Sequence, residues 1–68
     1  MNNFYKRIKE LREDNNLSQT DLAIALNIRQ STVAKWENGT RIPSAESIIL
    51  LAKFFKVSAD YLLGLEVF

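Results

Sequence analysis

The stretch LSQTDLAIALNIRQSTVAKWENG, residues 17–39, decides the fold of this 68-residue chain. Ser18 is a good N-cap for a helix, and Asp21 three residues later can return the hydrogen bond as in a capping box. Leu17 and Leu22 flank this start at the spacing of a hydrophobic staple. The stretch therefore predicts a short helix that begins at Ser18.

A second helix follows after a turn of three or four residues, beginning at residue 29 or 30 and ending at Asn38-Gly39. Two helices this short must cross at a steep angle, which requires a small residue at the crossing and a turn residue that accepts a positive φ. Ala23 and Asn27 meet these two requirements. The apolar side chains that would pin the crossing are Leu22, Leu26, Ile28, Val33 and Trp36. The segment at about 18–38 is therefore predicted to be a helix-turn-helix.

Three further helices are predicted around this segment, at residues 3–15, 44–55 and 58–64. Each shows apolar residues at helical spacing, and Ser44 and Ser58 are suitable N-caps for the second and third of them. The 44–55 helix is apolar over much of its circumference, so we expect it to be the central buried helix. Together these elements predict an all-α fold with five helices.

The composition excludes several classes of protein. The chain has neither cysteine nor histidine, which argues against disulfides, metal sites and the usual general acid–base catalyst, so we expect no cofactor and no enzyme. No stretch approaches the roughly 18 apolar residues of a membrane span, and residues 1–7 lack the apolar core of a signal peptide. We therefore expect a soluble cytoplasmic protein, with one domain over residues 1–68 and a short apolar tail at 65–68.

Motifs along most of the chain point to one family. They are Leu17-Ser18-Gln19, Leu22-Ala23, Val33, Trp36-Glu37-Asn38-Gly39, Pro43 and Val57-Ser58-Ala59-Asp60-Tyr61-Leu62-Leu63-Gly64. This combined pattern resembles the phage-repressor and Cro-type helix-turn-helix proteins, the XRE family. Two positions depart from the family pattern: Asn27 replaces the more usual glycine, and Arg29 replaces a serine or threonine N-cap, whose loss costs about 1 kcal/mol.

The resemblance implies both a fold and a function. The fold is a compact five-helix domain like that of lambda repressor. The function is that of a sequence-specific transcriptional regulator, expected to be a repressor, that binds double-stranded DNA through the major groove. In the docking geometry of such proteins, the N-terminal part of the second helix of the motif enters that groove.

The outward face of the 30–37 helix supplies the candidates for base reading. Val33 and Trp36 fix its inward face, because residues three apart lie on one side of a helix. We expect Trp36 to pack in the core rather than stack on bases. The candidates are Gln30, Ser31 and Lys35, followed by Thr32 and Ala34. Glutamine can bond adenine in a bidentate pair, lysine can reach guanine, and small side chains can meet a thymine methyl group.

Candidates for phosphate binding surround this helix. They are Gln19, Arg29, Asn38, Arg41 and Arg12. The net charge is only +1, yet between residues 27 and 43 three cations accompany Glu37 as the only acid. Two interpretations stay open for Arg29, a phosphate contact or a solvated side chain. Two also stay open for Arg12, a phosphate contact or an ion pair with a carboxylate within the fold.

Two further questions remain at this point. A module of this fold could bind protein instead of DNA, although the polar and basic residues on the 30–37 helix favour DNA. The apolar residues 61–68 could form a homodimer contact or simply close the core. A dimer would predict a near-palindromic operator with half-sites about 10 base pairs apart. No small-molecule ligand is implied.

Overall fold

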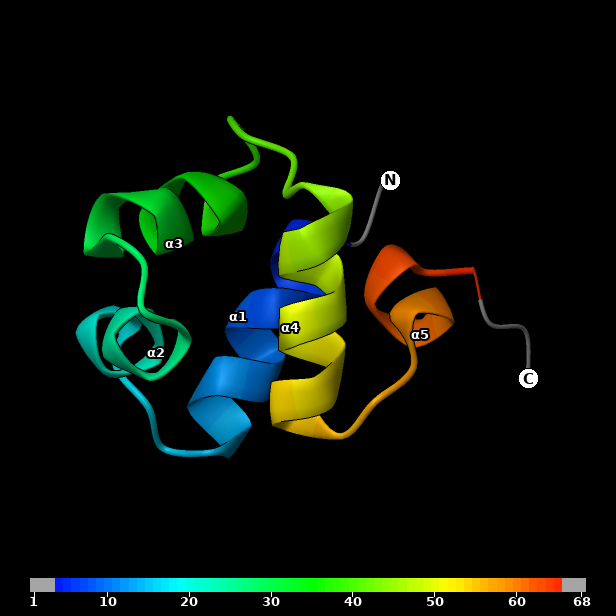
Figure 1. Cartoon of the computed structure of the whole chain (residues 1–68), viewed down its shortest axis with the longest axis horizontal. Coiled ribbons are helices and arrows are strands. Elements are labelled where there is room, and N and C mark those ends of the chain that lie inside the picture. The colour runs from blue at the N-terminus through cyan, green and yellow to red at the C-terminus, as the bar shows by residue number, and fades with distance from the viewer. Residues whose placement is uncertain (1–3, 66–68) are drawn as a thin grey trace.

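Five helices follow one another along residues 4–65, the part of the chain that the computed structural model describes. They are α1 (Phe4–Asp14), α2 (Gln19–Leu26), α3 (Gln30–Glu37), α4 (Ala45–Phe55) and α5 (Ala59–Leu63) (Figure 1). Residues 4–65 contain no strand, which confirms the all-α prediction. The radius of gyration is 10.8 Å, close to the roughly 11 Å expected of a compact domain of this length. Among these helices none is long and apolar enough to cross a membrane.

Serine side chains begin three of the five helices. The Ser18 hydroxyl accepts the Asp21 N–H at 2.9 Å, and the Asp21 carboxylate accepts the Ser18 N–H at 2.9 Å, which confirms the capping box. Ser44 and Ser58 cap α4 and α5 in the same way, each accepting a backbone N–H from three residues later. These caps satisfy donors that would otherwise be left without a partner at the helix ends.

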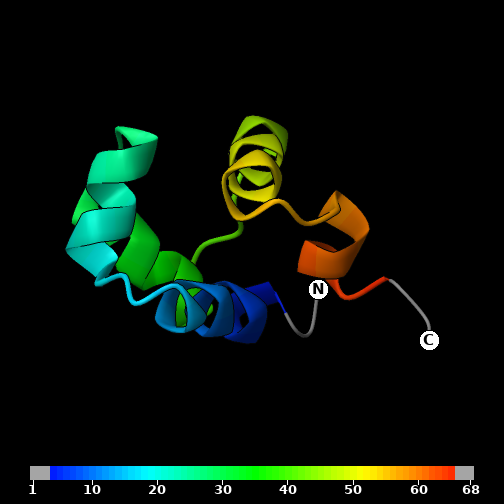
Figure 2. The ribbon, with the colours of Figure 1, turned by 90° about the horizontal axis from the view of Figure 1, so that it is seen from below.

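The core takes a contribution from each of the five helices. Its fully buried members are Phe4, Ile8, Leu22, Ala23, Val33, Trp36, Leu51 and Leu62. Trp36 is only 2% exposed, which confirms its assignment to the core. Helix α3 packs against α2 and α1, and α5 packs against α4 and α1. Figure 2 shows the result: α2 and α5 lie at opposite ends, with α1 and α4 between them.

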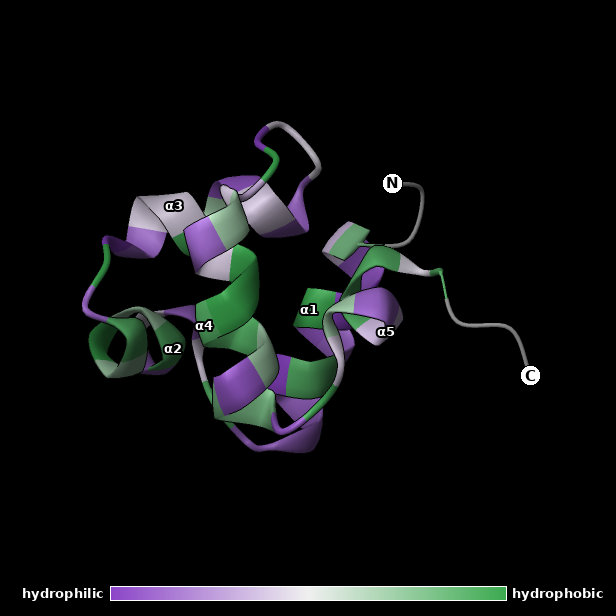
Figure 3. Ribbon diagram, turned by 45° about the vertical axis from the view of Figure 1, so that its right-hand side comes forward, coloured by the Kyte–Doolittle hydropathy of each residue, from purple (hydrophilic) through white to green (hydrophobic). Residues whose placement is uncertain are grey.

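The prediction that α4 is the central buried helix is wrong. Only Leu51 is fully buried, whereas Ile49, Leu50 and Phe54 are 51%, 48% and 40% exposed. Figure 3 shows that the helix is hydrophobic over much of its surface. A domain this small has too few elements to cover a helix on every side, so part of its apolar surface stays in contact with solvent.

The C-terminal residues have separate roles. Leu62 is buried in the core, and the Arg7 guanidinium lies over the Tyr61 ring, 4.3 Å from its centroid. Leu65 is exposed, and residues 66–68, which belong to the tail considered for dimer contact, lie outside the described residues. The described part of this segment therefore mainly closes the core between α1 and α5.

Candidate nucleic-acid interface

The turn between α2 and α3 fixes how the two helices cross. Asn27 adopts the left-handed conformation, with φ 57° and ψ 46°, and its N–H bonds to the end of α2. The Ile28 N–H then reaches the Ala23 carbonyl oxygen at 2.9 Å. Asparagine tolerates this conformation better than most residues, so it can replace the family's usual glycine. The turn holds α3 at one end of the molecule with one side exposed (Figure 1).

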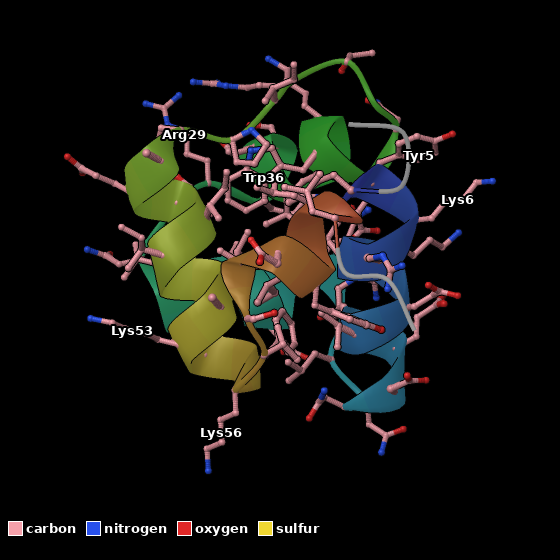
Figure 4. The ribbon with its side chains drawn as sticks, turned by 90° about the vertical axis from the view of Figure 1, so that its right-hand side faces the viewer. Tyr5, Lys6, Arg29, Trp36, Lys53 and Lys56 are labelled. Carbon is pink, nitrogen blue, oxygen red and sulfur yellow. The ribbon has the colours of Figure 1, made fainter. Side chains whose placement is uncertain are left out.

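The candidates for base reading all lie on the accessible part of α3. Gln30, Ser31 and Lys35 are exposed, and Thr32 and Ala34 are partly exposed. The N-terminus of α3 has Arg29 as its N-cap residue, without a side-chain capping bond, as its departure from the family pattern predicts. The helix is instead held by the burial of Val33 and Trp36, and Figure 4 shows Trp36 inside the molecule.

Four side chains form a continuous row of hydrogen bonds from α1 to the start of α3. Arg12 donates to both Glu37 carboxylate oxygens, through Nε at 2.7 Å and Nη2 at 2.9 Å. Gln19 Nε2 donates to Glu37 Oε1 at 3.1 Å. Gln30 Nε2 in turn donates to Gln19 Oε1 at 2.6 Å. The row therefore connects α1 to the first residue of α3.

The direction of this row follows from chemistry. An ionised carboxylate can only accept hydrogen bonds, so Gln19 must present its NH₂ group to Glu37. Its carbonyl oxygen then faces Gln30, which must present its own NH₂ group in return. Gln30 consequently keeps its Oε1 and its second N–H for an outside ligand. The Glu37 carboxylate thus sets the orientation of two amides in series.

For Arg12, the structure shows the intramolecular interpretation. The side chains of Arg12 and Glu37 are only 11% and 5% exposed, and Arg12 Nη1 also donates to the Leu17 carbonyl oxygen at 2.7 Å. The hydrogen bond to Glu37 raises the pKa of Arg12, against the opposing effect of its burial. Because the guanidinium is held within the fold, we leave Arg12 out of the proposed DNA contacts.

An open hollow of about 520 Å³ lies between α1, α2 and α3. Its lining residues are Lys9, Arg12, Glu13, Gln19, Ala34, Glu37 and Asn38. The hollow brings the predicted residues Gln19, Ala34 and Asn38 together with Lys9, which the sequence analysis did not select. The available signal was position, since Lys9 lies three residues before Arg12 and therefore on the same side of α1.

The remaining predicted residues lie around the ends of α3. Arg29 is exposed just before the helix and Arg41 is exposed just after it. The loop that carries Arg41 is tied back, because the Thr40 and Arg41 N–H groups donate to the Lys35 carbonyl oxygen at 3.0 and 3.2 Å. The three cations of residues 27–43, Arg29, Lys35 and Arg41, are all exposed. The only acid of this segment, Glu37, is already neutralised by Arg12.

Comparison with known proteins identifies this arrangement. A family model described as helix-turn-helix matches residues 8–62, which includes most of the chain. The chain belongs to the helix-turn-helix family of the phage-repressor type. The match extends beyond α2 and α3 to all but the ends of α1 and α5, so the family includes the elements that support the motif.

Curated relatives of this helix-turn-helix chain are named as transcriptional regulators. An activator, BcrR of Enterococcus faecalis, is 38% identical over 93% of the chain and 31% of its own length. The regulator AnsR of Bacillus subtilis is 43% identical over 88% of the chain and 52% of its own. The cryptic phage repressor RstR of Vibrio cholerae is 33% identical over 79% of the chain and 49% of its own. The chain thus spans about a third to a half of these relatives.

Proposed function

We propose that the chain is a transcriptional regulator that binds double-stranded DNA sequence-specifically, with α3 in the major groove. The family and the names of its relatives support regulation of transcription. The observation that carries the proposal for this chain is the row that ends at Gln30. Gln19 contacts the Gln30 amide, and Glu37 and Arg12 hold Gln19 in turn. This series fixes the orientation of Gln30 before binding, which prepares it to recognise a ligand.

Gln30 is the central base-reading residue of this proposal. Its free Oε1 accepts from adenine N6 while its second N–H donates to adenine N7, which is the bidentate pattern that glutamine makes with adenine. Lys35, five residues further along α3, reads guanine. Ser31, Thr32 and Ala34 meet neighbouring base edges or thymine methyl groups. Specificity then comes from the first turns of α3.

The phosphate contacts proposed here position α3 without reading sequence. Gln19 lies at the first turn of α2, where free backbone N–H groups favour an anion. Asn38 and Arg41 flank the other end of the motif, and Arg29 lies at the start of α3. We add Lys9, which lines the same hollow as Gln19 and Asn38. The three cations of this set, Lys9, Arg29 and Arg41, account for DNA binding by a chain whose net charge is only +1.

We further propose that two copies of the chain bind one near-palindromic operator, because a single α3 covers only a few base pairs. The outer side of α4 is the surface we assign to the second copy, since Ile49, Leu50 and Phe54 are exposed there. We prefer this surface to the C-terminal segment, because the described residues 61–64 of that segment are buried or partly buried. Repression is the regulatory outcome we propose, because it requires only that the operator be occupied.

Nuclear magnetic resonance of the ¹⁵N-labelled protein tests the interface. A duplex of arbitrary sequence at low salt suffices, because non-specific binding uses the same phosphate contacts. Amide shifts should change at the start of α2, in the first half of α3 and at residues 38–41, and not in α5. Changes confined to α4 and α5 would contradict α3 as the DNA-contacting helix. No change at all would contradict DNA binding and favour a protein-interaction module.

A further inference from the structure

Asn38 is followed directly by Gly39, and this is the only Asn-Gly pair in the sequence. Asparagine side chains are attacked by the backbone nitrogen of the next residue, and glycine has no side chain to hinder that approach. Asn38 is exposed and follows the last residue of α3, so it is outside the protection of a helix interior. The pair therefore combines a reactive sequence with an accessible position.

The folded protein restrains this pair. Asn38 Oδ1 accepts the Thr40 N–H at 3.0 Å and the Thr40 hydroxyl at 2.6 Å. The Gly39 N–H donates to the Trp36 carbonyl oxygen at 3.3 Å. A ψ of 1° at Asn38 places the Gly39 nitrogen beside the Asn38 backbone nitrogen, away from its side chain. Reaction requires rotation about this bond, which breaks the contacts just described.

The position of Asn38 makes its charge important. It lines the hollow that also contains Lys9 and Gln19, on the surface proposed to face DNA. Glu13 and Glu37 already line the same hollow. A further carboxylate there would repel the phosphates that Asn38 is proposed to contact, because the two charges would lie within a few ångströms.

We propose that Asn38-Gly39 is a site of spontaneous deamidation that switches off DNA binding, at a rate set by the Thr40 hydrogen bonds. This inference rests on the proposed function. The Gly39 nitrogen, losing its proton, forms a bond to Asn38 Cγ, and the Cγ–Nδ2 bond breaks to release ammonia. Water then opens the resulting succinimide, which leaves aspartate or isoaspartate at position 38. No oxidant, enzyme or metal is required.

The first experiment measures the reaction by mass mapping of the peptide that contains Asn38. Thr40→Val removes the hydroxyl bond and keeps the branched shape, and Thr20→Val, on the exposed side of α2, is the matched control. At neutral pH, folded Thr40→Val should deamidate several-fold faster than the wild type and the control, and all three should react equally in concentrated urea. Equal rates in the folded state, or no reaction of the folded wild type, would overturn the proposal.

The second experiment measures the consequence on DNA binding. The deamidated fraction of aged wild-type protein, separated by charge, and Asn38→Asp should each bind an operator about tenfold more weakly than fresh protein. Asn38→Ser cannot deamidate and adds no charge, so it should lose less DNA affinity than Asn38→Asp. Equal binding by the fresh and deamidated fractions would overturn the switch. Failure of fresh protein to bind any duplex would instead contradict the proposed function.

Discussion

Among single residues, Glu37 has the central position, because it contacts Arg12 and orients Gln19 and, through it, Gln30. Its partners could not be predicted from local pattern, because Arg12 and Glu37 are 25 positions apart. Helical periodicity identifies the exposed side of α3, and resemblance supplies the docking mode. Neither reveals that the carboxylate of the last residue of α3 sets the direction of the Gln30 amide. Lys9 lies one turn before Arg12 on α1, but the residues of α2 and α3 that share its hollow become its neighbours only in the folded chain.

Glu37→Gln tests this role. The amide group can donate as well as accept, so Gln19 and Gln30 lose their fixed orientation, and Arg12 loses its opposite charge. We expect the free energy of unfolding to fall by about 1.5–3 kcal/mol, the range for hydrogen bonds to charged groups, and adenine preference to relax. Urea unfolding and binding to single-base operator variants measure the two effects. Glu13→Gln, an exposed acid in the same hollow, should change neither.

Lys35 and Arg41 are assigned different tasks, and their alanine variants should separate them. Lys35→Ala should weaken binding by roughly 1–3 kcal/mol and relax preference at one position of the operator. Arg41→Ala should weaken binding about equally on all sequences and lower the salt slope by about one unit. Lys6→Ala, at an exposed cation of α1 outside both proposed surfaces (Figure 4), is the matched control and should leave the affinity and the salt slope unchanged. Uniform loss from both variants would show that Lys35 does not read a base.

Among the helices, the caps and the turn could be predicted from the sequence, because neighbouring residues alone form them. The capping box of α2, the serine caps of α4 and α5 and the turn at Asn27 were all predicted from neighbouring residues and are confirmed. The burial of α4 was predicted wrongly, because hydrophobicity around a helix does not say how many other elements can cover it. Burial is a property of the whole arrangement.

The capping box of α2 predicts a dependence of stability on acid. Hydrogen bonds from Ser18 lower the pKa of Asp21 below its ordinary value of 3.8. The ionised carboxylate therefore stabilises the fold above that value, and its contribution is lost as the pH falls through the lower folded-state pKa. The difference in unfolding free energy between wild type and Asp21→Asn should be present at neutral pH and disappear in strong acid. A difference independent of pH would contradict the charged cap.

The cap itself gives a simpler prediction at the same scale. Ser18→Ala removes the acceptor for the Asp21 N–H and should lower the free energy of unfolding by about 1 kcal/mol. Thermal or urea unfolding measures this loss. Ser31→Ala, an exposed serine within α3 that accepts no capping bond, is the control for stability and should change it by less than half as much.

In the whole molecule, α3 lies at one end and α5 at the other (Figure 1). The outer side of α4 lies between them and keeps apolar side chains exposed. This separation allows one surface to contact DNA while another contacts a second copy. Leu50→Glu places a charge in the proposed dimer contact and should reduce dimer formation in sedimentation experiments, and with it operator affinity.

The control for this prediction is Ile24→Glu, because Ile24 is also exposed, at 73%, but lies on α2. It should leave the oligomeric state unchanged. If the wild-type protein stays monomeric at micromolar concentrations, with and without DNA, the proposed dimer is wrong. That result would not bear on base reading by α3, which has its own test.

In the proposed complex, α3 reads DNA with Gln30 oriented toward adenine. The most direct measurement is selection from a random double-stranded pool by the purified wild type and by Gln30→Ala, at near-physiological salt, followed by sequencing. We predict that the wild type selects a near-palindromic consensus with half-sites about one helical turn apart. Each half-site should contain an adenine that Gln30→Ala no longer requires. No enrichment, or the same consensus from both proteins, would contradict it.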